Sequence, residues 1–487
     1  MKLKIQGLFI VLFLRVATMH AQVPDSKLDT AGITKQPLSL EQCIDYALKN
    51  NIQIKQSEVN TEVSDINLVQ SQASLLPALN ANASHTYNFG TTIDRYTNKF
   101  ANTQVLSQNL GLSVDFTLFN GLQTINTIHQ NRYLYLSSKC NVDKMKNDVS
   151  LNVATAYLQI LYNTEAVENA RNQIKVTTAQ SERAKKLVEA GSVAKGSYLD
   201  IMAQVATEEL NLTNAENQLS ISYLSLAQLL NLPSAQGLRI VKPEINIEGQ
   251  PLLAAGDANQ IYTTALGILP EIKSADYNVK SAEKGLDVAW GGLSPRLSLS
   301  AFYGTGYSGL NKRLIGDPIL GYQPNGDLTS SGETVFSPYL TNATETTPFL
   351  KQYNANKNQS IGFYLTIPIF NRFQVRTSIS RARMQMLNAE LQMESTKLQV
   401  QKNVQQALAD ANAGLKKYYA STKAVEAIAE SFKYTEQKFN VGIVNTNDYN
   451  DSKNKLIKAQ SDLLQAKYEY LFKTKVLDFY QGKPLKL

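Results

Sequence analysis

The chain has 487 residues, 43% hydrophobic and 18% charged, a composition that is ordinary for a folded or secreted protein and excludes a disordered one. Its net charge of +7 is not gathered into a basic stripe with interleaved aromatic residues, so nucleic acid is not an expected partner. Cys43, Cys140, His85 and His129 lack the spacing of a metal site, and no phosphate-binding glycine loop or nucleophile elbow occurs. We therefore expect no metal, no cofactor and no enzyme activity.

The N-terminus is expected to be a secretory signal over residues 1–21. Basic residues precede an apolar run over 8–14, and Ala21 is a small residue at a plausible cleavage point. The run is shorter than the roughly 20 apolar residues that a transmembrane helix needs. The mature chain would therefore leave the cytoplasm, with residues 22–37 as an N-terminal extension. Gln22 stands where a lipidated protein would carry Cys, so no lipid anchor is expected.

One pattern occurs twice along the chain. The segments after Cys43 and Ile261 match at one constant offset, and the segments after Phe119 and Phe370 match at a second, larger one. The difference between the two offsets is an insertion in the second half. The sequence therefore predicts a duplicated chain. Its parts are a first repeat over 38–232, a linker over 233–257 and a second repeat over 258–487.

Long stretches with no proline and few glycines predict very long helices. Apolar residues from Ala411 to Phe439 recur in steps of four and three, which is typical of a left-handed coiled coil. Gly191 and Gly442 each interrupt such a stretch, as expected of a left-handed residue that ends a helix and lets the chain reverse. Short leading and returning helices would stack end to end beside each long one. The predicted helices cover 39–75, 121–190 and 197–231 in the first repeat and 258–293, 374–441 and 448–480 in the second.

Strands are predicted between the leading and long helices, where apolar and polar residues alternate. A strand of about 10 residues is long enough to cross a bilayer when it is tilted, and strands can span a bilayer only as part of a closed barrel. Four strands cannot close, so several copies must combine, and three would supply twelve. The expected strands cover about 78–89, 109–119, 296–303 and 360–370, with 90–108 and 304–359 as polar loops. The expected lipid-facing residues are Leu110, Leu112, Val114, Phe116, Leu118, Ile361, Phe363, Leu365, Ile367 and Ile369.

The order of several segments resembles the TolC-like outer membrane efflux protein family over residues from about 38 to 485. These segments are LEQCIDYALKNN, FTLFNGLQ, IPIFNRFQ and the glycine turns EAGSVAKGSYLD and FNVGIVNTNDYND. The resemblance implies a mainly α protein with a membrane β-barrel. A homotrimer would form a 12-stranded barrel among outer membrane lipids and a long α-helical tunnel in the periplasm of a Gram-negative bacterium, with the linker in an equatorial region.

The function implied by this resemblance is that of a passive outer membrane channel of a tripartite efflux or type I secretion system. Its partners would be a periplasmic adaptor (membrane fusion) protein and an inner-membrane transporter of RND, ABC or MFS type. The sequence leaves open the exported substrate and the type of transporter. The alternative is a secreted or surface coiled-coil protein for structure or adhesion without a pore, which explains the helices but not the matched pairs of strands.

The resemblance also implies that the glycine turns lie at the periplasmic aperture, where two aspartates six and nine positions after the second glycine ring the constriction. Here these are Asp448 and Asp451. Three copies would bring like charges together and favour cations. The alternative is that Asp448 is a helix N-cap and Asp451 a first-turn acid, and the two interpretations are compatible.

Val444 and Phe439 depart from the family pattern, which has Arg and Tyr at these positions as part of a polar latch. Ser197 likewise stands where the family has Asp in the first turn. The aperture is therefore expected to be held by packing of Val193, Val444 and Phe439, with Asp200 adding charge.

Overall fold

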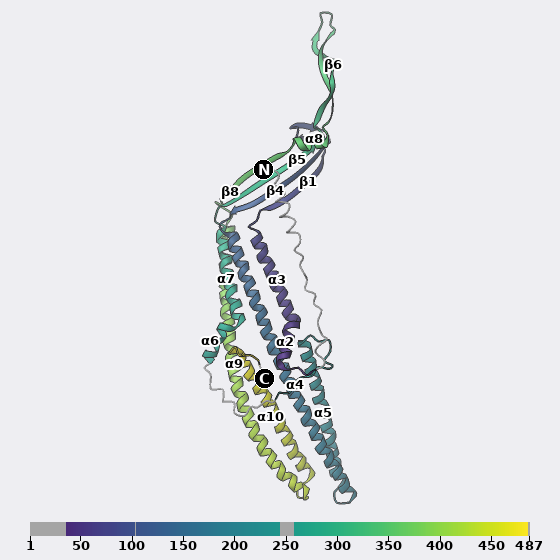
Figure 1. Cartoon of the computed structure of the whole chain (residues 1–487), viewed down its shortest axis with the longest axis vertical. Coiled ribbons are helices and arrows are strands. Elements are labelled where there is room, and N and C mark those ends of the chain that lie inside the picture. The colour runs from purple at the N-terminus through teal and green to yellow at the C-terminus, as the bar shows by residue number, and fades with distance from the viewer. Residues whose placement is uncertain (1–35, 103, 244–257, 486–487) are drawn as a thin grey trace. The chain divides into compact units, whose positions relative to one another are not determined.

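The computed structural model describes residues 36–102, 104–243 and 258–485. The signal expected over 1–21, most of the extension and much of the linker lie outside the described residues. The chain is mainly helical, with strands between the helices of each half, which confirms the predicted class. Figure 1 shows these elements, which fall into two compact units. The described parts of Met1–Gln56, Met145–Ile268 and Val400–Leu487 make the first unit, and those of Ser57–Lys144 and Leu269–Gln399 make the second.

The first unit is a group of helices with an apolar core between them. The long helices α4 (Gln123–Glu189) and α9 (Gln374–Asn440) contribute their C-terminal parts, and α5 (Lys195–Leu229) and α10 (Thr446–Tyr480) return after the two glycine turns. Among the described residues, no helix combines the length and hydropathy needed to cross a membrane. The core contains Cys43 and Ala47 of α2 (Leu40–Asn50), Val153, Tyr157 and Ile160 of α4, Leu226 of α5 and Leu471 of α10.

The leading helix predicted over 39–75 is in fact two helices, α2 and α3 (Ile52–Ala73), because the backbone is extended at Asn51. The Asn51 side-chain oxygen accepts the backbone N–H groups of Gln53 (2.8 Å) and Ile54 (3.4 Å). Its amide nitrogen donates to the Leu229 carbonyl at the end of α5 (2.9 Å). One side chain thus satisfies both the start of α3 and the end of α5, so the first turn of α3 follows directly on α5.

Replacing Asn51 with Ala is expected to cost about 1–2 kcal/mol, because both helix ends lose a hydrogen-bond partner. Thermal unfolding followed by circular dichroism measures the loss. Asn50 provides the matched control, since its side chain only donates back to Tyr46 within α2 (3.1 Å). Equal effects of the two alanine substitutions would contradict the role of Asn51.

The second leading helix, predicted over 258–293, is also two helices, α6 (Ala258–Ile268) and α7 (Pro270–Gly291). Pro270 is the first residue of α7, and the residue before it, Leu269, is extended. Proline has no N–H to continue α6, and its ring disfavours a helical conformation in the preceding residue. The prediction of one continuous helix was therefore wrong at a position that the proline marks.

The second unit contains a four-stranded antiparallel sheet in the order β1 (Ala78–Asn88), β4 (Val105–Phe119), β5 (Arg296–Ser308) and β8 (Asn358–Thr366). Figure 1 shows these four strands side by side. Val114 of β4 pairs with Leu79 of β1 and Ala301 of β5, and Ala301 pairs with Ile361 of β8. Because side chains alternate along each strand, this register places these residues, and those at every second position from them, on one face, which is mostly apolar.

Two segments predicted as loops contain further strands. β2 (Thr91–Asp94) and β3 (Lys99–Asn102) pair within 90–108, and β4 begins at Val105, earlier than expected. Within 304–359, β5 continues to Ser308, β6 (Lys312–Leu328) pairs with β7 (Thr334–Thr346), and α8 (Phe349–Ala355) follows. The expectation of four strands was therefore wrong, since the part of the chain that the structure describes contains eight. Only four of these make the sheet that joins the two halves.

The strand predicted over 360–370 ends at Thr366, so Ile367 and Ile369 follow β8 instead of lying in it. Pro368 lies between them and cannot donate a backbone hydrogen bond to a neighbouring strand. The side chains of Ile367 and Ile369 are 58% and 95% exposed. Their assignment to the lipid-facing side of a strand is therefore corrected, although both remain exposed apolar residues.

Candidate functional site

The two glycine turns of the first unit have the same backbone structure. Gly191 and Gly442 have φ angles of 73° and 78°, in the left-handed region. After α4, the N–H of Ser192 donates to the carbonyl of Leu187 (2.8 Å), and after α9 the N–H of Ile443 donates to that of Lys438 (2.9 Å). The glycine N–H groups donate to the carbonyls three residues earlier, to Val188 and Phe439 (3.0 and 3.1 Å). This is the helix-ending motif that glycine favours, and it occurs once in each repeat.

The returning helices begin differently after these turns. Asn445 is the N-cap of α10, and its side chain accepts the backbone N–H of Asp448 (2.8 Å). Asp448 is therefore a first-turn acid and not the N-cap, so that part of the alternative interpretation was wrong. Ala194 precedes α5 and makes no side-chain capping bond. The Asp448 carboxylate is exposed at a helix start, where the helix dipole favours negative charge.

The other predicted aspartates are also exposed, but their charges are balanced differently. Asp451 pairs with Lys455 one turn later in α10 (2.6 Å), and both side chains are about two-thirds exposed. Asp200 occupies the corresponding place in the first repeat and is exposed in α5. Among the described residues, Asp448 and Asp200 have no ion-pair partner. The structure of one chain therefore leaves Asp448 with more uncompensated charge than Asp451.

Phe439 packs inside its own chain. Its ring stacks on Tyr449 of α10, with centroids 4.5 Å apart, and Phe432 of α9 contacts the same tyrosine at 5.4 Å. Tyr449 is buried, and burial raises the pKa of its hydroxyl. Val444 is half-buried in the turn itself. Phe439 thus holds α10 against α9 within one hairpin.

Several polar contacts connect the α4–α5 hairpin with the α9–α10 hairpin near their turns. The Gln180 amide of α4 donates to the Tyr449 hydroxyl of α10. The Arg183 guanidinium of α4 donates to the Asn440 side chain at the end of α9 (2.9 Å). The hairpin ends are therefore joined to each other by side chains within a single chain.

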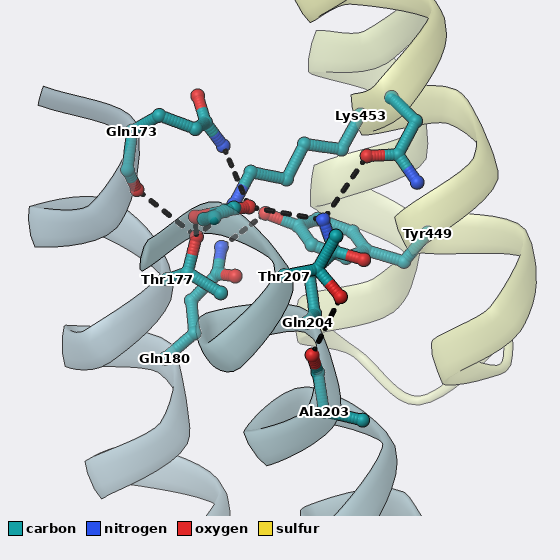
Figure 2. Close-up of polar contacts among 10 residues, drawn as sticks. Gln173, Thr177, Gln180, Ala203, Gln204, Thr207, Tyr449 and Lys453 are labelled. Atoms are coloured by element: carbon teal, nitrogen blue, oxygen red, sulfur yellow. Dashed lines mark hydrogen bonds and ion pairs between the residues drawn. The ribbon is translucent and has the colours of Figure 1, made fainter. Parts of the chain in front are cut away.

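A buried ion pair lies close to these contacts. The Lys453 ammonium of α10 is 3.3 Å from the Glu208 carboxylate of α5, and the two side chains are only 3% and 4% exposed. Figure 2 shows Lys453 and Tyr449 reaching from α10 toward Thr177 and Gln180 of α4. The Thr177 hydroxyl contacts both charged groups. The Gln204 amide also donates to Glu208 (3.1 Å).

Burial governs the energetics of this cluster. It lowers the pKa of Lys453, and the nearby Glu208 carboxylate opposes that shift. A buried charge costs free energy unless it is paired and hydrogen-bonded, and here each charge has its partner. Among the described residues, no group of three histidine, cysteine or acidic side chains could hold a metal ion. The arrangement provides a polar connection between α4, α5 and α10.

The sequence prediction missed Lys453, Glu208 and Thr177, although a signal for two of them was present. Glu208 lies one heptad after buried Ile201, and Lys453 follows buried Tyr449 by one helical turn. Both are charged residues at positions where a coiled-coil pattern expects an apolar side chain. An acidic residue in the apolar seam of one returning helix and a basic residue in that of the other could therefore have indicated a buried ion pair.

Comparison with known proteins gives consistent matches. The sequence pattern of the family described as "Outer membrane efflux protein" matches residues 43–232 and 261–482. A Haemophilus influenzae protein is 24% identical over 54% of this chain and 55% of its own length. Outer membrane protein TolC of Escherichia coli is 22% identical over 75% of this chain and 72% of its own length.

The fold is also that of a solved structure. The outer membrane protein VceC of Vibrio cholerae has a TM-score of 0.73 and 15% identity, with 92% of this chain and 96% of that chain covered. At this identity the likeness concerns the fold alone. The family pattern, in contrast, spans both repeats and includes both glycine turns. The chain belongs to the outer membrane efflux protein family.

Proposed function

We propose that the protein is the outer membrane channel of an efflux or type I secretion system and acts as a passive conduit. The observation that carries this proposal is the apolar face of the β1-β4-β5-β8 sheet. Its side chains are exposed, with Ile361 at 76%, Phe363 at 69% and Leu110 at 48%. An exposed apolar face of this size is unfavourable in water and favourable against lipid. Family membership makes the outer membrane the location of the chain.

A trimer is proposed because the sheet is open. β1 and β8 lie at its two edges, and an open edge is not tolerated in hydrocarbon since its backbone groups lack partners. Three copies that pair β8 of one with β1 of the next would close a barrel of twelve strands. Ions and solutes would then pass along the polar face of the sheet and between the helices of the three chains.

The hairpin ends at Gly191 and Gly442 are proposed as the periplasmic aperture. Asp448, Asp451 and Asp200 would supply negative charge there, and Phe439 and Val444 would support the turn by packing. A periplasmic adaptor and an inner-membrane transporter are the proposed partners, by analogy with the family. The contacts of Lys453, Tyr449 and Arg183 would hold the two hairpins of each chain together while the aperture is closed.

Planar-bilayer conductance of the purified, detergent-extracted protein tests this proposal. Stepwise single-channel current that divalent cations block from one side is the expected result. Folded protein that inserts into the bilayer and carries no current, even after Phe439 and Val444 are replaced with smaller residues to loosen the turns, would contradict a channel. It would favour the secreted coiled-coil alternative.

The aspartates are expected to differ in their effect on that block. Replacing Asp448 with Asn should weaken the divalent-cation block more than replacing Asp451, because Lys455 already offsets the charge of Asp451 at 2.6 Å. The dose dependence of single-channel block measures both variants. Asp462→Asn is the control, because it removes the same charge from α10 at a position further from the turn. Equal block in the wild type and the Asp448 variant would exclude the ring of acids.

A further inference from the structure

The segment that connects β8 to α9 in the second unit is unusually apolar and exposed for a loop. Ile369 is 95% exposed, Phe370 72% and Phe373 59%. The two phenylalanine rings contact each other edge to face, with centroids 5.7 Å apart. Arg372 lies between the two phenylalanines and Arg376 follows them in the first turn of α9, and both arginine side chains are exposed.

The order of residue types along this segment matches the order of layers in a membrane leaflet. The exposed apolar residues of β8 come first, Phe370 and Phe373 follow with Arg372 between them, and Arg376 comes last. Hydrocarbon, the interface and the phosphate layer succeed one another in a leaflet, and aliphatic, aromatic and cationic side chains favour these layers respectively. The segment thus has the composition of a chain leaving a bilayer.

The charge of this region is entirely positive. The sequence has no acidic residue between the end of β8 at Thr366 and Glu390, while four arginines lie in that interval. Among the described residues, neither Arg372 nor Arg376 has an ion-pair partner in its own chain. Asp287, in the last turns of neighbouring α7, already pairs with Lys284 (2.8 Å). The two guanidinium groups are therefore left without an anion.

The charges at the other ends of these strands are different. The β6–β7 hairpin, which follows β5 there, carries Asp317, Asp327, Glu333 and Glu345 beside Lys312 and Arg313, and Arg313 is paired with Glu345. The β6–β7 end therefore carries acids together with its cations, whereas the segment from the end of β8 into the first turns of α9 carries cations alone.

Arg372 also occupies a backbone conformation that an arginine disfavours. Its φ angle is 54°, and Gly121 holds the corresponding place in the first repeat with φ 66°. Glycine is the ordinary residue in this conformation. The second repeat thus keeps a long cationic side chain at a position where the first repeat has none.

We propose that Arg372 and Arg376 bind the phosphate groups of anionic phospholipids in the leaflet next to the helices, with Phe370 and Phe373 inserted beside them. This inference rests on the proposed function, since it requires the sheet to lie in a bilayer. Guanidinium groups bind phosphate through paired N–H donors, and basic side chains next to a membrane segment attract anionic headgroups. A second copy of the chain is the less favoured occupant, because covering this segment with protein would need an acidic partner surface for the two arginines.

The single tryptophan of the chain provides the probe. Trp290, 46% exposed, lies at the end of α7, and a side-chain atom on nearby Gly292 would be 3.2 Å from Val375 beside Arg376. The full protein is reconstituted into phosphatidylcholine vesicles that contain phosphatidylglycerol, and bromine on the acyl chains of one lipid or the other quenches Trp290. The ratio of the two quenching curves gives the preference for phosphatidylglycerol.

The wild type is expected to prefer phosphatidylglycerol severalfold, and the preference should fall as salt shortens the Debye length. Arg372→Gln combined with Arg376→Gln should abolish it. Arg383→Gln is the matched control, because Arg383 lies on the same face of α9 as Arg376 but one heptad, about 10 Å, further along the helix. That variant should retain the preference.

Three results would overturn the inference while leaving the channel intact. They are equal quenching by both brominated lipids in the wild type, an unchanged preference in the double variant, and quenching by neither lipid in protein that conducts, which would mean that a second copy covers the segment. Quenching by neither lipid in protein that also fails to insert would instead count against the proposed function, on which this inference depends.

Discussion

Replacing Lys453 with Met is expected to destabilise the hairpin ends by about 3–5 kcal/mol, because Glu208 would remain as a buried charge without its partner. The amide groups of α5 and α10 around Glu208 and Lys453 should lose protection first. Hydrogen exchange followed by mass spectrometry measures this loss segment by segment, which suits a chain of two compact units better than a single global transition. Under the proposed function, the same variant should also show more frequent opening in bilayers.

The double variant separates the charge from the packing. Combining Lys453→Met with Glu208→Met removes both charges, and its stability should return close to that of the wild type or exceed it. Lys455→Met tests an exposed pair in the same helix and should change stability by less than about 1 kcal/mol. Unchanged exchange in the Lys453 variant would show that the buried pair does not form.

Replacing Gly121 with Ala is expected to prevent correct packing where β4 meets α4. An added Cβ would lie 2.4 Å from the Gly291 carbonyl oxygen and 2.5 Å from the Ser294 Cβ, and the φ angle of 66° is itself unfavourable for alanine. The left-handed backbone costs about 1–2 kcal/mol, and overpacking adds about 1–3 kcal/mol. The yield and thermal stability of the detergent-extracted protein measure the combined effect.

Gly191 provides the control for the backbone contribution alone. Its φ angle is 73°, close to that of Gly121, but no atom lies within 4 Å of the position of an added Cβ. Gly191→Ala should therefore cost only about 1–2 kcal/mol, without loss of yield. If the two variants behaved alike, the close approach of Gly121 to α7 would not be a real constraint.

Much of the architecture was predictable because its signals are local. Proline-free stretches with heptad spacing predict the long helices, and a lone glycine predicts where each reverses, since glycine adopts the left-handed conformation without a steric penalty. Alternation of apolar and polar residues likewise predicts β4 and its apolar face. Each property depends on residues within a few turns or pairs of one another.

Two predictions of secondary structure, the continuous leading helix at Asn51 and the loop at the β6–β7 hairpin, were wrong because contacts with distant segments decide the structure there. Asn51 breaks a leading helix because its side chain donates a hydrogen bond to the carbonyl of Leu229 at the end of α5, 178 positions away in the chain. The β6–β7 hairpin lies in a segment rich in glycine and polar residues, which is also the composition of a loop. Strand pairing is a contact between segments, so composition alone could not distinguish the two.

The sequence by itself determined the repeats, the long helices, the glycine turns and the apolar strand faces of this protein, because each follows from local backbone preference and periodicity. Only the tertiary structure decided that Lys453, Glu208 and Thr177 come together, that Phe439 stacks on Tyr449, and that four strands share one mostly apolar face. These results depend on the register between helices and strands that are distant in sequence. That register is set by the packing of many side chains at once, so the sequence of no single segment determines it.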